Sequence, residues 1–116
     1  MSARASVVFI SYLDRAAINF SASGDNVVVP AVAGKQIKVY RLKLLCASAT
    51  ALSFKDGVGG TVLEGPMPFS ANQGMIEDYT SIDMPPWYTT SPGNALVINS
   101  SNAVQIGGAL DYSVGT

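Results

Sequence analysis

Apolar and polar residues alternate with a period of two along most of this chain. Ile18 and Phe20 alternate with Asn19 and Ser21, and the same pattern returns in residues 95–99. A period of two is typical of a β-strand, because successive side chains point to opposite faces. Eight or nine such segments follow one another, and turn signals of Gly, Pro, Asn or Ser separate almost every pair. The pattern predicts an all-β, antiparallel β-sandwich of eight or so strands, most economically a jelly roll.

The strongest of these segments covers residues 36–48. Its first apolar residues, Ile37 and Val39, occupy odd positions. The later set occupies even positions and consists of Tyr40, Leu42, Leu44 and Cys46. A slip of one residue in the alternation is what a β-bulge produces. We therefore expect a bulge near Val39 and Tyr40, and a central strand whose two apolar sets lie on opposite faces.

Glycine and proline mark the places where strands are expected to stop. Proline lacks the N–H that a sheet ladder needs, so residues 65–68, Gly-Pro-Met-Pro, are predicted to lie outside the sheets. Two glycines, Gly107 and Gly108, are predicted to break the strand that begins at Val104. Residues 77–86 show no alternation, which indicates a long irregular loop.

Residues 1–14 fall outside this rhythm and match helical and strand spacing equally well. Their β-branched content favours an extended arm, followed by a single sandwich domain over residues 15–116. An apolar arm that leads a compact domain often packs on a neighbouring subunit, so we expect it to be a docking arm. Its candidate docking side chains are Val7, Val8, Phe9, Ile10 and Tyr12.

The chain has few charged side chains. Asp, Glu, Lys and Arg make up 13% of its 116 residues, against a usual share of about 25%, and thirteen Ser, six Thr and six Asn take their place. The apolar fraction of 48% excludes disorder, and no apolar run approaches the roughly 18 residues of a membrane span. Protein interfaces are depleted in Lys, Glu and Asp. We therefore expect this surface to be buried in a homo-oligomer or a larger shell.

The charges are unevenly divided along the chain. Residues 1–55 hold seven cations and two anions, a balance of +5, and residues 56–116 hold six anions and no cation, a balance of −6. Two such poles would let copies stack head to tail, whereas a sandwich that interleaves the two halves would mix the charges in space. We expect the charges to mix. The cations do not cluster as a nucleic-acid-binding surface requires, so no nucleic acid is expected as a partner.

Few residues of this chain are suited to catalysis or metal binding. The chain has no histidine, which removes the usual general base and the commonest metal ligand, and its single cysteine, Cys46, is expected to be a buried, inert thiol. Glu77, Asp78 and Asp83 could ligate calcium or form a glycosidase pair, but their spacing fits neither dedicated motif and favours a solvated acidic loop. We predict no enzymatic activity, no catalytic residue, no cofactor and no metal site.

Three aromatic residues, Tyr79, Trp87 and Tyr88, lie in or beside the predicted loop. Exposed aromatic rings can stack on sugars, which would make them a ligand site. The alternative, which we favour, is that Trp87 anchors the loop onto the sandwich or onto a neighbouring subunit.

The order of strands and turns resembles that of small jelly-roll proteins of tailed bacteriophages, which decorate or cement capsids or form the bases of head fibres. The resemblance covers about residues 15–114 and rests on the order and spacing of strands and turns rather than on a specific motif. The segments that carry it are Ala33–Tyr40, Ala51–Gly57, Leu63–Met67, Trp87–Thr90, Gly93–Ile98 and Val104–Tyr112.

This resemblance implies a non-enzymatic virion protein, assembled in the host cytoplasm. It also implies a homotrimer with subunits packed side by side around a three-fold axis, attached to the major capsid protein or another virion protein, with no membrane partner. The alternative is a receptor- or glycan-binding β-sandwich module, such as a fibre tip, which would need Trp87 and Tyr88 to be exposed.

Overall fold

The computed structural model describes residues 13–78 and 84–116, which form nine strands and no helix. The strands are β1 (Asp14–Phe20), β2 (Gly24–Val29), β3 (Gln36–Cys46), β4 (Thr50–Asp56), β5 (Thr61–Phe69), β6 (Gly74–Glu77), β7 (Tyr88–Thr89), β8 (Leu96–Ser100) and β9 (Ile106–Gly115). The expectations for the side chains of the arm, Val7, Val8, Phe9, Ile10 and Tyr12, and for Tyr79 and Asp83 fall outside the described residues.

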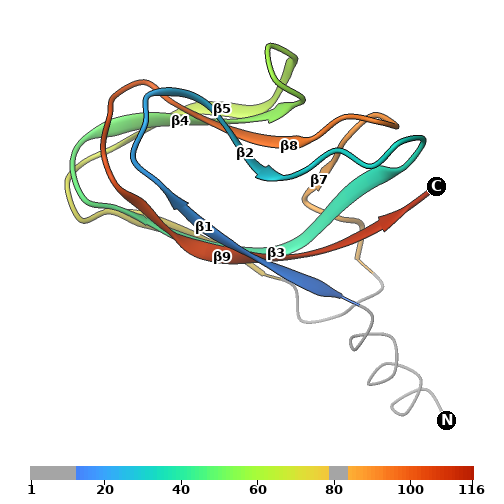
Figure 1. The fold of residues 1–116 in the computed structure, drawn as a ribbon. Helices are drawn as coiled ribbons and strands as arrows, with labels where there is room; N and C mark the ends of the chain where they lie inside the picture. The colour runs from blue at the N-terminus through green and yellow to red at the C-terminus, as the bar shows by residue number, and fades with distance from the viewer. Residues whose placement is uncertain (1–12, 79–83) are drawn as a thin grey trace, which may run out of the picture.

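The strands form two antiparallel sheets that lie one above the other (Figure 1). One sheet has the order β1-β9-β3-β6, with β7 also pairing with β3, and the other has the order β2-β8-β4-β5. The pairings are nested, since β1 pairs with β9, β2 with β8, β3 with β6, and β4 with β5. Nested pairing of eight strands across two sheets is a jelly roll. The predicted fold class is therefore confirmed.

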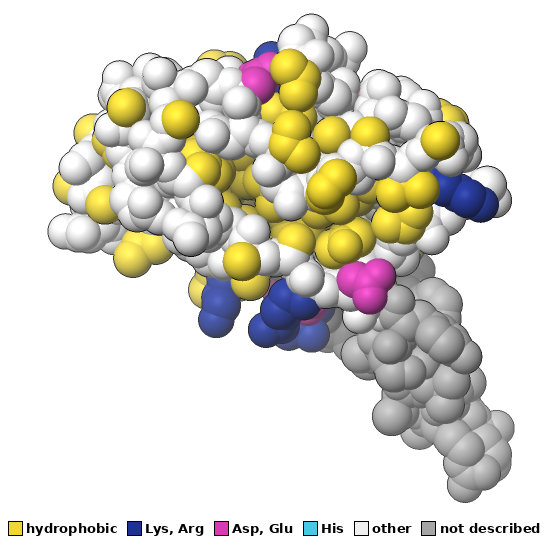
Figure 2. All heavy atoms as spheres, in the orientation of Figure 1, with side chains coloured by type: hydrophobic (Ala, Val, Ile, Leu, Met, Phe, Trp, Pro, Cys, Tyr) yellow, Lys and Arg dark blue, Asp and Glu magenta, His cyan; other side chains and the backbone are white. Residues whose placement is uncertain are grey.

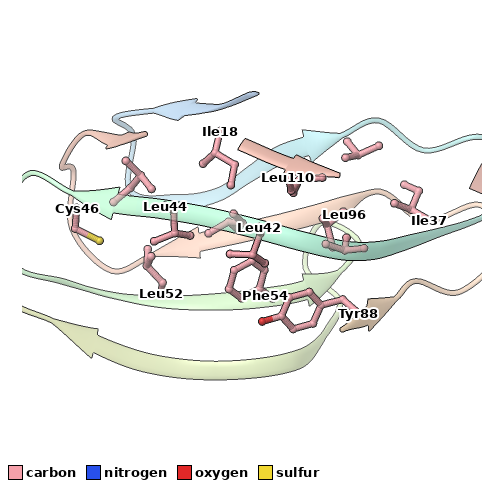
Figure 3. Close-up of a cluster of buried hydrophobic side chains, with 14 residues drawn as sticks. Ile18, Ile37, Leu42, Leu44, Cys46, Leu52, Phe54, Tyr88, Leu96 and Leu110 are labelled. Carbon is pink, nitrogen blue, oxygen red and sulfur yellow. The ribbon is translucent and has the colours of Figure 1, made fainter. Parts of the chain in front are cut away.

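Apolar side chains from both sheets fill the space between them (Figure 3). Phe54 and Leu96 of one sheet and Ile18, Ile106 and Leu110 of the other have at most 1% of their surface exposed. Each such side chain contributes about 1.5–3 kcal/mol when fully removed from water. This layer is the main source of stability of the sandwich, since no disulfide supports it: Cys46 is a free, buried thiol whose pKa is raised by burial, as expected.

Strand β3 is central and carries the predicted bulge, but the expected facing of its side chains is wrong. Its register against β9 shifts between Val39 and Arg41. Ile37 and Val39, before the shift, lie in the same core as Leu42, Leu44 and Cys46, after it. The extra residue shifts the inward positions from odd-numbered to even-numbered residues, while the same face of the strand stays toward the core. The bulge therefore keeps both apolar sets on one face instead of dividing them between two.

Proline does not interrupt the second sheet, contrary to the prediction for residues 65–68. These residues lie within β5, which forms the edge of its sheet next to β4. An edge strand has one row of N–H groups that needs no ladder partner, so proline is tolerated there. The pairing of β4 with β5 also shifts between Leu52 and Phe54, opposite this segment.

Glycine does not break the last strand either. Strand β9 continues through Gly107 and Gly108. A Cβ atom on Gly108 would lie 1.9 Å from the carbonyl oxygen of Lys43 in β3. The absence of a side chain at Gly108 thus lets two central strands approach each other.

Charges from the two halves of the chain mix in space, as expected. Arg15 pairs with Asp111 at 2.8 Å, so a cation of the first half meets an anion of the second. Within the first half, Lys55 lies 3.0 Å from both carboxylate oxygens of Asp25. Asp25 also accepts hydrogen bonds from the backbone N–H of Gly59 and from the amide of Asn99, and these contacts hold its pKa below its usual value.

Candidate functional site

The outer face of the β1-β9-β3-β6 sheet is the most unusual surface of the described residues. An antiparallel sheet with one packed face normally places polar side chains on its other face. Here two successive rows of outward positions on four adjacent strands carry small, apolar or amide side chains and only one charge, while the next row carries the charged residues Arg15, Asp111 and Arg41. We call this surface the flat face; it consists of Ala17 and Asn19 of β1, Gly107 and Ala109 of β9, Lys43 and Leu45 of β3, and Ile76 of β6.

The strand register makes the flat face continuous. Ala109 lies opposite Ala17 on one side and opposite Lys43 on the other, and Lys43 lies opposite Ile76. One step along the strands, Gly107 lies between Asn19 and Leu45 in the same way. The face therefore spans the full width of the sheet in two successive rows.

Two large apolar side chains stand on this surface. Ile76 is 77% exposed and Leu45 is 53% exposed. They lie on neighbouring strands at diagonal positions, and side chains so placed are about 7–8 Å apart. Leu45 lies between Gly74 and Gly107, and Ile76 lies opposite Lys43. Exposed apolar groups that lie together in this way mark interaction sites more often than single ones do.

A row of ion pairs borders the flat face. The guanidinium of Arg15 holds Asp111 through Nε at 2.8 Å and Nη2 at 3.3 Å. Arg41 of β3 contacts two carboxylates. Its Nε lies 3.0 Å from an oxygen of Asp78 and 3.8 Å from an oxygen of Asp111. Both arginine side chains are exposed to solvent, which screens the ion pairs, so these pairs contribute little to stability. Their effect is to hold two cations beside the apolar rows.

A hollow of about 210 Å³ lies between this row and the flat face. The side chains around it include Arg15, Arg41, Lys43, Ile76 and Ala109. Lys43 makes no ion pair with any residue that the structure describes.

The hollow is lined by charges of both signs. The cations are Arg15, Arg41 and Lys43, and the acidic residues are Glu77, Asp78 and Asp111, so the formal charges balance to zero. Figure 2 views the sandwich from the side and shows Lys and Arg side chains projecting from its underside, below the sheet that contains β1, β9 and β3.

A second cluster lies inside the sandwich, around Tyr88. Its ring reaches into the core from β7 and stacks on Phe54, with centroids 4.4 Å apart and planes at 11° (Figure 3). Its hydroxyl lies within hydrogen-bonding distance of Glu64 in β5 and of Glu77 in β6. A hydroxyl has a single proton to donate, so a second proton on a carboxyl is needed for both contacts to be hydrogen bonds.

Burial favours placing that second proton on Glu77. This side chain is 8% exposed, and burial raises its pKa, helped by the nearby charge of Glu64. The pKa of the Tyr88 hydroxyl is also raised, first by burial and then by the two carboxylates, so it stays protonated. The cluster links the edge strands of the two sheets through β7, which is a structural role.

The aromatic residues that the sequence singled out have different surroundings. Tyr88 is only 4% exposed, so its ring is not presented to a sugar. Trp87 is 37% exposed, and its backbone N–H donates to the carbonyl oxygen of Val39 at 2.7 Å, which fastens the segment before β7 to β3. The structure therefore does not bring Trp87 and Tyr88 together as an exposed platform.

The acidic residues of the predicted loop separate as well. Glu77 ends β6 and points into the core, while Asp78 pairs with Arg41 on the outer face. Among the described residues, no three acidic or cysteine side chains come close enough together to hold a metal ion. The described part of the chain also lacks any helix long and apolar enough to cross a membrane.

Sequence reasoning missed the residues of the flat face. The available signal was that Leu45 interrupts the alternation between Leu44 and Cys46, which places it on the outer face of a strand whose inner face is already apolar.

Comparison with known proteins adds no relative, since no family model, no curated protein and no solved structure matches this chain.

Proposed function

We propose that this protein is a non-enzymatic structural protein of a phage virion, whose homotrimers decorate or cement the capsid or form the base of a fibre. The observation that carries the proposal is the flat face, an outer sheet surface with two exposed apolar side chains and one cation. Such a surface favours a protein that works while covered by another one.

Two further features support this proposal. The chain has the jelly-roll fold of the small phage proteins that its strand rhythm resembles. Its surface is also poor in charge, at 13% of all residues, which leaves a free monomer little protection against association. A subunit that remains in an assembly does not need that protection.

The glycan-binding alternative gains less support. It needs Trp87 and Tyr88 as an exposed stacking platform, and Tyr88 is turned into the core against Phe54. An exposed Trp87 alone is one ring, anchored through its backbone to β3.

The proposal is tested by sedimentation velocity of the purified full chain at micromolar concentration. We expect the smallest species to have three times the 12.1 kDa chain mass and not to dissociate when sodium chloride is raised, because burial of apolar surface is not screened by salt. A monomer at this concentration would overturn the homotrimer.

A further inference from the structure

We propose that Lys55 and Asn99 form a covalent amide bond with each other on the β2-β8-β4-β5 sheet, with Asp25 between them as the proton carrier. The bond joins the Nζ atom of Lys55 to the Cγ atom of Asn99 and releases the side-chain nitrogen of Asn99 as ammonia. This inference goes beyond the proposed function, because it concerns three side chains within one copy of the chain.

The strand register brings the three side chains together on the outer face of this sheet. Asp25 of β2 lies directly opposite Asn99 of β8. Lys55 of β4 lies opposite Val97, two residues before Asn99 on the same strand. Side chains two residues apart on a strand share a face, and a diagonal neighbour on the next strand is within reach of a long side chain. Since the neighbouring Phe54 packs in the core, Lys55 points to the outer face.

The carboxylate of Asp25 contacts the nitrogen atoms of both partners. Its Oδ1 accepts a hydrogen bond from Nδ2 of Asn99 at 2.6 Å, and both of its oxygens lie 3.0 Å from Nζ of Lys55. The backbone N–H of Gly59 donates to Oδ2 at 2.7 Å and fixes the orientation of the carboxylate. One oxygen therefore touches both the amine and the amide nitrogen, as a group that carries protons from one to the other must do.

This cluster is largely removed from water. The side chains of Lys55 and Asp25 are only 15% and 14% exposed. Val27, Val97 and Val62 lie in the same row across the sheet as Lys55, and Val97 is fully buried although it lies on the outer face. Apolar surroundings weaken the solvation of charged groups, which makes the uncharged amine that the reaction needs easier to reach.

The reaction needs no oxidant and no metal. Lys55 first passes a proton from its ammonium group to Asp25, and the freed electron pair of Nζ attacks Cγ of Asn99. The bond between Nζ and Cγ forms, and the bond between Cγ and Nδ2 breaks. Overall, Nζ gives up two protons, Asp25 carries them to Nδ2, and the group leaves as an ammonium ion while Asp25 is a carboxylate again.

The rate of this reaction is limited by the ion pair. The hydrogen bond from Gly59 lowers the pKa of Asp25, which favours the ion pair of Lys55 and Asp25 over the uncharged pair. We therefore expect the bond to form slowly after folding. Once formed, it restricts the unfolded chain as a disulfide would, in a protein whose single cysteine, Cys46, excludes an intrachain disulfide.

The test is the mass of the full chain under denaturing conditions, measured after purification and again after long incubation at alkaline pH, which favours free amines. We expect the chain to become lighter by one ammonia molecule. Trypsin gives a second readout, because residues 56–116 contain no Lys or Arg. An acylated Lys55 is not cleaved, so residues 44–116 should remain one branched fragment, whereas the unmodified chain releases residues 56–116.

The matched variants separate this bond from other losses of ammonia. Lys55→Arg keeps the cation beside Asp25, but a guanidinium stays protonated and does not attack, so the full mass should be retained. Asp25→Asn keeps the size of the side chain but cannot carry the protons, and it should also retain the full mass. Lys35→Arg changes an exposed lysine in the loop between β2 and β3 and should lose ammonia like the original chain.

Three results would overturn the proposal. An unchanged mass of the original chain after incubation would leave the cluster as an ordinary ion pair. Loss of ammonia that persists in Lys55→Arg would place the reaction elsewhere in the chain, and loss of water instead of ammonia would mean that Lys55 has joined the carboxyl of Asp25. All three are measured on the denatured chain, so they are independent of the oligomeric state that tests the proposed function.

Discussion

At the scale of single residues, the Tyr88 hydroxyl lies between two glutamate carboxyls that come from different sheets. Burial of Glu77 raises its pKa above 4.5, the ordinary value that it has in the unfolded chain. Between 4.5 and the raised pKa, the folded state binds more protons than the unfolded state. The free energy of unfolding therefore falls as the pH rises through this window, and the contribution of Glu77 is fully present only below 4.5.

The variant Glu77→Gln should remove this fall, because an amide stays neutral and can still donate a hydrogen bond. We expect it to raise the free energy of unfolding at neutral pH by about 1 kcal/mol, the net size of one buried hydrogen bond. The measurement is denaturant unfolding from pH 4.5 to neutral pH. The control is Asp14→Asn, which removes an exposed carboxyl. A profile of Glu77→Gln that runs parallel to that of the original chain would contradict the shared-proton cluster.

At acid pH, the free energy of unfolding changes with pH in the opposite direction. The pKa of Asp25 and that of Asp56 lie below their usual value of 3.8, the first mainly through the N–H of Gly59. For Asp56, hydrogen bonds from Ser91 and Asn94 outweigh the effect of burial. The stability that these carboxylates contribute is present above 3.8 and is lost as the pH falls through their folded pKa. It therefore does not overlap the window of Glu77.

At the scale of elements, two adjacent glycines of β9 have opposite requirements. A Cβ atom on Gly108 would lie 1.9 Å from the carbonyl oxygen of Lys43, while a Cβ atom on Gly107 meets nothing within 4 Å. We expect Gly108→Ala to destabilise the protein by more than about 2 kcal/mol, since β3 and β9 would have to separate. Gly107→Ala should be neutral or slightly stabilising, because alanine restricts the unfolded chain.

Thermal unfolding of the two variants side by side measures this difference, and each serves as the control for the other. If both variants melt with the original chain, the close approach of β3 to β9 at Gly108 is not as described. A large loss for Gly107→Ala would mean instead that the flat face is filled from outside in the assembled protein.

The alternation of side chains predicted most strands and their turns, and also the bulge of β3, because each of these depends on local geometry. It did not predict whether the odd-numbered or the even-numbered residues of β3 are buried on each side of the bulge, since that depends on the register against β9. It likewise placed residues 65–68 outside the sheet, because the position of β5 at a sheet edge is set by the whole topology.

The same limit applies to the candidate site. Ala17, Lys43 and Ile76 are far apart along the chain and become neighbours only through two strand pairings and the crossovers between the sheets. No short sequence motif identifies such a surface. The aromatic pair Trp87 and Tyr88 was visible in the sequence, but only Tyr88 lies in β7 with its ring in the core, while Trp87 precedes the strand and is 37% exposed.

At the scale of the whole molecule, the flat face should govern how copies of this protein associate with one another when no partner is bound. Without its partner, the face stays exposed, and two copies that meet through it bring Ile76 against apolar surface but Lys43 against like charge. Salt shortens the range of that repulsion, from about 10 Å at 0.1 M to about 3 Å at 1 M, and leaves the apolar attraction in place. Association beyond the basic oligomer should therefore increase with salt.

Light scattering at low and high sodium chloride measures this association. We expect Ile76→Asp to suppress it at both salt concentrations, because the substitution replaces the more exposed of the two large apolar side chains of the face with a charge. Val58→Asp, at a 67% exposed position in the loop between β4 and β5, is the matched control and should associate like the original chain. Association that instead weakens as salt is added would indicate contact through ion pairs, since salt screens the attraction of opposite charges, and would remove the flat face from the explanation.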